Sequence, residues 1–503
     1  MSFSFNSSAQ SIDDEQNTDE LPGFFARFFY VVRSRFSLHE KYGLPLTIGI
    51  ALTLFFVFVF LGILQDYIGH DPLVQADIRV VKVVELFRSH TLNNVMLFMS
   101  NLGKWQIVFS GMIVIGFILF SLNLLPYLFM LVVSASGGEL IVSLIKNMVA
   151  RPRPPIISSL LLENGFSFPS GHGFIAFSFY GFLAYIIYRT SRKKIWKAMA
   201  IVGGAGVIGF IAFSRVYLGA HWPSDVLASL ALGAAWLCVL ITILEIRRTV
   251  PAKSDEKALI GKRFILIPSL VLFLLWIFYM SYFFSNIAFS SPGTLIENAI
   301  YIEEKDIPAA LFSQLPLSSE TITGLPMEPI NIIVVGSYEN LVAAFESVGW
   351  VQPDPITLKT GWRHTVASIF DKPYPKALET PSFWNSQTND FAFQLPTKTI
   401  RQRYHVHFWT TPLLTDQHRR IWFATSHFDQ AINFKTIWPT HKINPDVDNT
   451  RNKIKDDISK TGMLEKAEEL QIVQARQGKN QAGDAFSTDG KAFVLFLKDK
   501  GGR

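Results

Sequence analysis

The sequence predicts a membrane-embedded all-α core followed by a soluble α/β or α+β domain. Charged residues make up only 17% of the chain and hydrophobic residues 49%, whereas soluble proteins carry about 25% charged residues. Apolar runs of about 20 residues, long enough to cross a bilayer, recur through the first half of the chain. Beyond residue 288 these runs stop, and Pro, Thr, Trp and His become more frequent.

The first segment, residues 1–42, precedes any apolar run. Its first part is polar and ends in an acidic patch, a composition typical of disorder. Gly23–Phe36 then alternates aromatic residues with three arginines, which suits either an interfacial helix on an anionic leaflet or an ordinary juxtamembrane linker. The first apolar run follows this long lead and exceeds the h-region of a secretory signal, so we expect a membrane span.

Seven apolar segments are predicted to span the membrane, six in a core at 43–250 and one after a loop, within 251–290. They lie near residues 44–65, 106–122, 126–146, 172–188, 197–214, 224–244 and 264–287. Two short basic loops, Arg189–Lys197 and Glu245–Arg263, are cytoplasmic under the positive-inside rule. The loops at 66–105, 147–171 and 215–223, with everything after the seventh span, then lie on the outer side. The lone cysteine, Cys238, falls inside an apolar run and is expected to pack there.

Residues 291–440 are predicted to form the soluble domain. "INIIVVGS" and the following "YENLVAAFESVGW" indicate a buried strand, a turn and an amphipathic helix. "IRQRYHVHFWT" and "RRIWFATSHFD" indicate two further strands.

Residues 441–503 are expected to be a polar C-terminal tail. It contains a predicted helix at 458–477 and, around Asp489-Gly490, a predicted hairpin.

Three polar clusters fall at the outer ends of predicted helices. They are Lys146, Arg151 and Arg153; then Ser170, Gly171 and His172; and then Arg215, His221 and Asp225. Arginine and lysine bind phosphate oxygens, and a glycine lets the backbone approach an anion. The first cluster is basic on the outer side, against the positive-inside rule, which indicates a local use for its charge. The clusters therefore predict a phosphate site at the membrane surface.

The third cluster places a histidine and a carboxylate at i, i+4, where Pro223 opens a helix. Asp225 can accept from one ring nitrogen of His221 and leave the other free to attack phosphorus, while His172 acts as an acid. This inventory predicts phosphate transfer through a phosphohistidine, with cations in place of a metal. The plainer alternative is that the cations only extend to the membrane interface, with the histidine and tryptophan in an aromatic belt. This alternative is disfavoured because all three clusters fall on the same side of the membrane.

"KNMVARPRP", "PSGH" and "SRVYLGAHWPSD" together resemble the three-part signature of the type 2 phosphatidic acid phosphatase and haloperoxidase superfamily, over roughly residues 70–245. The resemblance implies a six-helix phosphatase bundle, here with one further helix, that acts on lipid phosphates. It assigns phosphoryl oxygens to Lys146, Arg153 and Arg215 with help from Ser170 and Gly171, nucleophilic attack to His221, orientation of that ring to Asp225, and protonation of the leaving group to His172.

Two residues go beyond this signature. Arg151 is a neighbour of Arg153 that either adds positive field or only caps the helix. Glu139 lies seven residues before Lys146 on roughly the same helix face. An intramembrane carboxylate is costly and often functional, so it either holds a cation or lines a substrate channel, or else makes a polar helix-packing contact.

The soluble domain resembles the LssY-type C-terminal domain that occurs fused to such phosphatases. His405 and His407 alternate on one strand face, and four further polar residues are expected near them: Arg401, Arg403, His427 and Asp429. Such a set suits either a metal site or a polar ladder on the strand. We favour the ladder, and therefore expect neither a metal nor a cofactor.

The function expected from these features is hydrolysis of phosphatidic acid, phosphatidylglycerol phosphate or a polyprenyl diphosphate at the outer leaflet of a bacterial inner membrane. The expected partners are the lipid substrate and the bilayer, not nucleic acid. Two alternatives stay open: a vanadate-dependent haloperoxidase, which would need no lipid access, and a membrane anchor or transport component whose outer domain carries the function.

Overall fold

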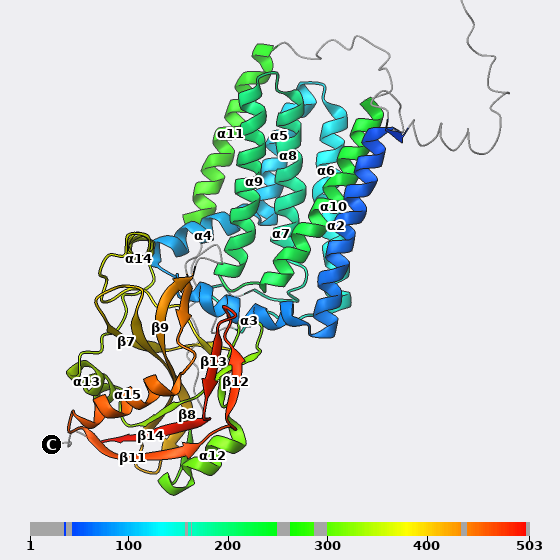
Figure 1. Cartoon of the computed structure of the whole chain (residues 1–503). Coiled ribbons are helices and arrows are strands. Elements are labelled where there is room, and N and C mark those ends of the chain that lie inside the picture. The colour runs from blue at the N-terminus through cyan, green and yellow to red at the C-terminus, as the bar shows by residue number, and fades with distance from the viewer. Residues whose placement is uncertain are drawn as a thin grey trace, which may run out of the picture.

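The computed structural model describes residues 35–36, 43–155, 159–161, 163–248, 262–285, 299–433 and 440–498. It consists of a bundle of long helices and, at one end of that bundle, a domain built around a β-sheet (Figure 1). The predicted division into an all-α part and a sheet-containing part is therefore confirmed. The expected N-terminal interfacial helix and the basic loop at 249–261 lie almost wholly outside the described residues.

Five described helices are long and apolar enough to cross a membrane. They are α2 (Leu44–Gly69), α6 (Leu125–Val149), the continuous segment Gly171–Thr190, α9 (Lys194–Tyr217) and α10 (Pro223–Arg248). A sixth span results if α4 (His90–Leu102) and α5 (Trp105–Ser121), which are bent by 57° at their break, are counted together. Five of the six predicted core spans thus correspond to helices long and apolar enough to cross a membrane, and the sixth depends on counting α4 and α5 together.

The expected seventh span stays a prediction. It coincides with α11 (Lys262–Ser285), which contains Pro268. Within the described part of this helix, the apolar stretch Pro268–Tyr282 is shorter than the other spans.

Residues 66–105, expected as a loop, instead form the helices α3 (Pro72–Glu85) and α4. α3 is amphipathic and carries the buried polar residues Asp77 and Arg79, so a search for long apolar runs misses it. Ser89 caps α4 by accepting a hydrogen bond from the Leu92 amide at 3.3 Å. α3 lies between the helix bundle and the C-terminal domain (Figure 1), and the end of the bundle beside it is called the α3 end below.

The segment Gly171–Thr190 is not a regular α-helix. It consists of α7 (Gly171–Ile175), a π-helical turn at Ala176–Tyr180 and α8 (Gly181–Thr190). Such π-bulges are frequent at functional sites. Ser170 caps α7, because its hydroxyl accepts from the Gly173 amide at 3.3 Å.

The sheet of the C-terminal domain has the buried strand β4 (Ile332–Val335) in its interior. β4 pairs in parallel with β14 (Lys491–Leu497) and antiparallel with β9 (Arg420–Asn433). The sheet runs in the order β1-β8-β9-β4-β14-β11, and β7 and β10 add to β8 and β9. These other strands are β1 (Ile300–Ile302), β7 (Phe391–Pro396), β8 (Arg403–Thr415), β10 (Thr440–Ile443) and β11 (Leu464–Gln471).

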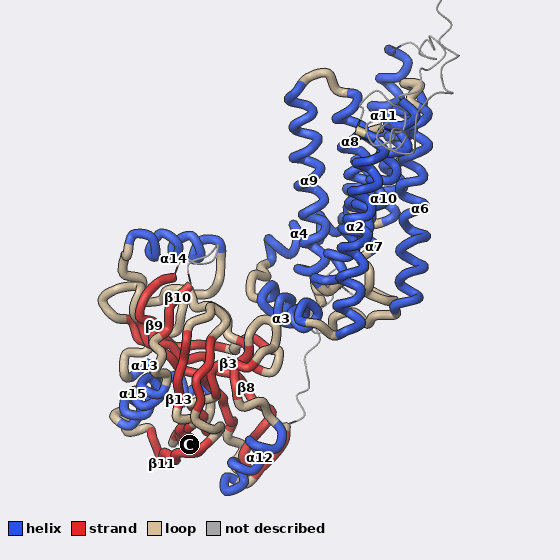
Figure 2. Tube along the Cα trace, turned by 45° about the vertical axis from the view of Figure 1, so that its right-hand side comes forward, coloured by secondary structure: helices blue, strands red, loops and turns tan. Residues whose placement is uncertain are grey.

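Helices cover both faces of this sheet (Figure 2). α13 (Tyr338–Ser347) and α15 (Asp448–Ser459) pack their apolar residues into one cluster with β4. α12 (Ile307–Gln314) packs into the cluster on the other face. Smaller strands form β3-β2-β5-β6 and β12-β13: β2 (Ser318–Glu320), β3 (Pro326–Pro329), β5 (Phe383–Trp384), β6 (Gln387–Thr388), β12 (Arg476–Lys479) and β13 (Ala485–Thr488).

The predicted strand–turn–helix is confirmed as β4 and α13, with Ser337 capping the helix. The two strands predicted from aromatic-rich segments are confirmed as β8 and β9.

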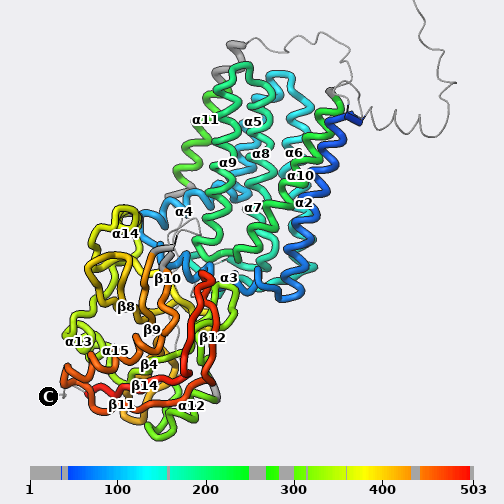
Figure 3. The backbone as a smooth tube through the Cα atoms, in the orientation of Figure 1, coloured from blue at the N-terminus to red at the C-terminus, as the bar shows by residue number. Residues whose placement is uncertain are grey.

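The predicted helix at 458–477 is wrong. α15 ends at Ser459, and β11 follows it and pairs antiparallel with β14. The expected hairpin is also wrong, because β13 pairs with β12 rather than with β14 across the Asp489-Gly490 turn. Figure 3 shows these last strands within the domain rather than as a separate tail.

The C-terminal domain contacts the bundle through α3. The Arg79 guanidinium donates to Glu320 at 2.7 Å and to Ser386 at 3.2 Å. Gly324, at a φ of +83°, lies so close that an added Cβ would stand 3.0 Å from Arg79 Nη2. The domain therefore docks at the α3 end of the bundle.

Candidate active site

The three polar clusters converge at the α3 end of the bundle. Lys146 lies in the last turn of α6, Ser170 caps α7, and Arg215 lies in the last turn of α9. His221 follows α9, and Asp225 lies in the first turn of α10. The Ser170 amide donates to the backbone carbonyl of Asp225 at 3.2 Å, which joins the second cluster to the third.

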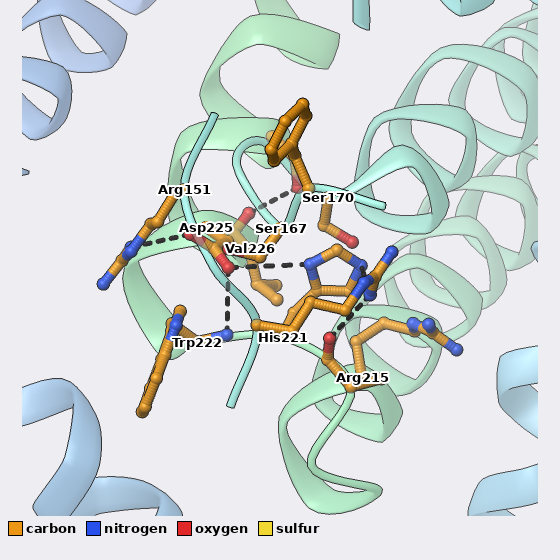
Figure 4. Close-up of polar contacts among 12 residues, drawn as sticks. Arg151, Ser167, Ser170, Arg215, His221, Trp222, Asp225 and Val226 are labelled. Carbon is orange, nitrogen blue, oxygen red and sulfur yellow. Dashed lines mark hydrogen bonds and ion pairs between the residues drawn. The ribbon is translucent and has the colours of Figure 1, made fainter. Parts of the chain in front are cut away.

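His221 and Asp225 form a buried pair, with Nδ1 of the ring 3.6 Å from Oδ2 of the carboxylate (Figure 4). The Trp222 amide donates to the same Oδ2 at 3.0 Å and fixes it. The other ring nitrogen, Nε2, lies 3.3 Å from Arg153 Nη1. Burial, followed by the positive charges of the neighbouring arginines, lowers the pKa of His221 well below 6.5. The ring is therefore neutral at pH 7.

Arg151 lies behind Asp225 and bridges two buried carboxylates. Its Nη1 donates to Asp225 Oδ1 at 2.6 Å, and its Nη2 donates to Asp77 Oδ2 at 2.6 Å. Asp77 in turn accepts from the Ser224 amide at 2.9 Å. Arg151 is thus neither a simple helix cap nor a ligand of the anion site: it holds the carboxylate that faces His221.

A carboxylate of the chain itself lies between the cations expected to bind phosphate. Glu163 pairs with the Arg215 guanidinium through one oxygen and with Arg153 Nη1, at 2.9 Å, through the other. Burial would raise the pKa of Glu163, but the positive charges of Arg215 and Arg153 outweigh it and hold this pKa far below 4.5. The cluster is therefore an anion site whose present anion is Glu163.

The remaining residues line the same site. Arg215 also donates to Ser100 of α4, and Lys146 Nζ donates to the Phe166 carbonyl at 2.9 Å. His172 Nε2 is buried and makes no hydrogen bond among the described residues. A Cβ added at Gly103, in the break between α4 and α5, would lie 2.9 Å from the His172 ring, so this break packs directly against the histidine.

Two expected residues stand apart from the site's polar contacts. Glu139 is exposed on α6, although its charge acts on Lys146 over a distance. Gly171 opens α7, and an added Cβ there would meet only Val142 at 3.9 Å. Packing within the chain therefore does not demand a glycine at 171.

Sequence reasoning missed Asp77, Ser100 and Glu163. All three lie outside the motifs, in segments expected as outer loops. Glu163 is the one acidic residue of 147–171, whereas Asp77 is one of four in 66–105; their presence does not identify a partner, and Ser100 gives no signal.

The expected histidine cluster of the C-terminal domain is an ion-pair network. His405 Nε2 lies 2.7 Å from Asp429, and its Nδ1 contacts Glu379. His407 lies 3.4 Å from Glu379, and His427 lies 3.7 Å from Asp429. Burial lowers the pKa of His405, but the negative charges of Glu379 and Asp429 outweigh burial and raise this pKa to about 9.

No group of three or more metal-ligating side chains in the described ranges is arranged to hold a metal ion. The strand register pairs His405 with His427 across β8 and β9. Of the two arginines expected nearby, Arg403 is buried and donates to Gln394 at 2.9 Å, whereas Arg401 is exposed and lies 3.5 Å from Asp371.

Comparison with known proteins gives two family matches. The PAP2 superfamily model matches residues 123–248, and the LssY C-terminus model matches residues 311–492. Phosphatidylglycerophosphatase B of Bacillus subtilis is 32% identical over 182 residues, which cover 35% of this chain and 87% of that protein. Undecaprenyl-diphosphatase of Sulfolobus acidocaldarius is 28% identical over 211 residues, which cover 41% of this chain and 95% of that protein.

One solved structure, a transmembrane PAP2-type phosphatidylglycerolphosphate phosphatase from Bacillus subtilis, matches at 25% identity and a TM-score of 0.35, and covers 41% of this chain and 98% of that chain. The family match at 123–248 contains every motif residue of the site described above. The chain therefore belongs to the PAP2 superfamily and carries an LssY C-terminal domain after its membrane helices.

Proposed function

We propose that this membrane lipid phosphatase cleaves a lipid phosphate monoester or diphosphate in two steps through a phosphohistidine on His221. The observation that carries the proposal is the position of one nitrogen, Arg153 Nη1. It lies 2.9 Å from the resident carboxylate of Glu163 and 3.3 Å from His221 Nε2. An anion that replaces the Glu163 carboxylate therefore lies beside His221 Nε2, the ring nitrogen that is free to attack.

In the first step the phosphoryl group occupies the position that the Glu163 carboxylate holds between the arginines. His221 Nε2 bonds to phosphorus, the bond from phosphorus to the leaving oxygen breaks, and that oxygen takes a proton from His172. Asp225 keeps the other ring proton on Nδ1 and offsets the positive charge that the ring acquires.

In the second step water attacks the phosphorus, His172 takes its proton, and the N–P bond breaks to release inorganic phosphate. Lys146, Arg153 and Arg215 neutralise the phosphoryl oxygens in both steps, so the scheme needs no metal. Ser170 and the start of α7 place a hydroxyl and a helix N-terminus beside them.

The substrate is a lipid, because the site lies at the ends of apolar helices. The relatives are named for a phosphatidylglycerophosphate and for an undecaprenyl diphosphate. We therefore propose phosphatidylglycerol phosphate, a polyprenyl diphosphate or phosphatidic acid as substrate. All three present a terminal phosphate at the bilayer surface.

The test is phosphate release from these three lipids by purified wild-type protein and His221→Ala. We expect a loss of at least about 3 kcal/mol of transition-state stabilisation, which is a factor of more than a hundred. His418→Ala, at a turn of the C-terminal domain, is the matched control and should keep full activity. An alkaline quench should trap labelled phosphohistidine in the wild type only. Activity retained by His221→Ala would reject the assigned nucleophile.

We also propose that the site opens on the outer side of a bacterial inner membrane, because the basic loops at Arg189–Lys197 and Glu245–Arg263 favour the cytoplasm. A reporter fused after Asn286 should then report the outer compartment. A cytoplasmic signal would reverse the sidedness of the site and leave its chemistry unaffected.

A further inference from the structure

We infer that helix α14 (Leu358–Phe370) of the C-terminal domain lies in the surface of the same bilayer and inserts its aromatic side chains into the leaflet at the α3 end. The domain then contacts the lipid directly, in addition to its contact with α3 of the helix bundle. The inference concerns a lipid-binding surface and does not depend on the proposed chemistry.

The exposed face of α14 is apolar and aromatic. Trp362, Ile369 and Phe370 are 73%, 55% and 66% exposed. Their spacing of seven and eight residues places them on one side of the helix. Ala367 and Ser368, on the other side, are buried against the domain. Large apolar side chains grouped in this way on a soluble surface mark a binding site rather than ordinary surface.

Cations lie among and beside these apolar side chains. Lys359 and Arg363 are exposed on the same helix, about 60° and 100° from Trp362 around its axis, so that Lys359 lies between Trp362 and Phe370 and Arg363 at the edge of the face. Lys372, just beyond the helix, lies with its ammonium group 5.8 Å from the centre of the Phe370 ring. An aromatic face bordered by lysine and arginine is the composition of helices that lie in the plane of an anionic membrane surface.

The position of α14 in the molecule favours the bilayer over a protein as the partner of this apolar face. Figures 1 and 2 show α14 on the side of the domain that faces the membrane helices, at the height of α4. Figure 2 shows its axis running across the bundle axis, as an in-plane helix requires. At that end of the bundle Phe98 of α4 and Trp105 of α5 are 47% and 69% exposed. The apolar face of α14 therefore continues the apolar belt of the bundle.

The experiment uses the full-length protein with Cys238→Ser as background, because Cys238 is the single cysteine of the chain. An environment-sensitive fluorophore is attached to Trp362→Cys or Phe370→Cys. The control is Phe312→Cys, which is 49% exposed on α12. Figures 1 and 2 show α12 at the end of the domain far from the bundle. Each protein is placed in nanodiscs of anionic and zwitterionic phospholipid, and retained phosphate release shows that it is folded.

We expect labels at 362 and 370 to emit at shorter wavelength than the label at 312 and to be quenched at least about twofold more by nitroxide-labelled phospholipid. Iodide in the water should quench the label at 312 preferentially. Equal iodide quenching at 362 and 312, without lipid quenching, would overturn the inference. Protection of 362 that appears only when unlabelled protein is added would also overturn it, because the covering surface would then be a second copy.

Discussion

Replacing Arg151 with methionine should destabilise the protein, whereas the same change two residues later, at Arg153, should mainly abolish activity. Arg151 is buried and supplies the 2.6 Å contacts to both Asp77 and Asp225. Methionine preserves much of the side-chain volume and leaves two buried carboxylates without their cation. Removing one partner of a buried ion pair costs about 3–5 kcal/mol.

At about 2–4 °C per kcal/mol, this cost corresponds to a fall of roughly 6–20 °C in Tm. Arg153→Met loses the pair with Glu163, but that carboxylate is 21% exposed and keeps its pair with Arg215, so the loss of stability should be smaller than in Arg151→Met. The loss of a phosphoryl contact in Arg153→Met should instead lower kcat by about a hundredfold or more. Differential scanning fluorimetry and phosphate release, on the same detergent-purified proteins, separate the two effects.

A second change checks the cause. Asp77→Asn in the Arg151→Met background removes one of the orphaned charges and should restore part of the lost Tm. Burial already raises the pKa of Asp77. The deficit of Arg151→Met should therefore shrink at mildly acidic pH, where that carboxyl group is protonated. An unchanged Tm in Arg151→Met, or a larger fall in Arg153→Met, would refute the assignment of the two arginines.

Three further outcomes are expected. Glu163→Gln removes the resident anion and should tighten competitive inhibition by inorganic phosphate about tenfold, by about 1.4 kcal/mol; an unchanged inhibition constant would contradict its place in the phosphate seat. The pKa of His405 is raised from 6.5 to about 9, so the protonated ring stabilises the folded C-terminal domain. This stabilisation is fully present below pH 6.5 and is lost as the pH rises through 9. The protection of β8 amides from hydrogen exchange, corrected for the intrinsic rise of the exchange rate with pH, should therefore fall over that range, but not in His405→Asn. Gly103→Ala forces a Cβ to within 2.9 Å of the His172 ring and should lower kcat, whereas Gly62→Ala, with open space around it, should not.

The motif residues could be predicted from the sequence because local spacing fixes their geometry. His221 and Asp225 are four residues apart at a helix start, and the structure places their side chains in contact range. Glu163 and Asp77 could not be predicted in the same way. Glu163 lies 10 and 52 residues from its partners Arg153 and Arg215, and Asp77 lies 74 residues from Arg151. No local periodicity encodes such pairings.

The fold of the C-terminal domain shows a different limit. β11 carries Lys466, Glu468 and Glu469, residues that favour helices when read locally. β11 is an edge strand, at the end of the sheet order. Charged residues are common on such edges because they prevent pairing with other chains. The charged residues that suggested a helix thus protect an exposed edge strand. Pairing with β14 outweighs their helix propensity.

The two faces of α3 limit how this chain can be recombined with its relatives. Asp77 accepts from Arg151, which also holds Asp225, and Arg79, two residues later, holds the C-terminal domain through Glu320. A chimera that grafts residues 299–498 onto another PAP2 membrane core would lose that anchor unless residues 72–85 were exchanged with them. Exchanging 72–85 would in turn require a matching arginine at the position of Arg151. Exchange of either domain of this protein therefore requires matched changes in α3, the helix that contacts both of them.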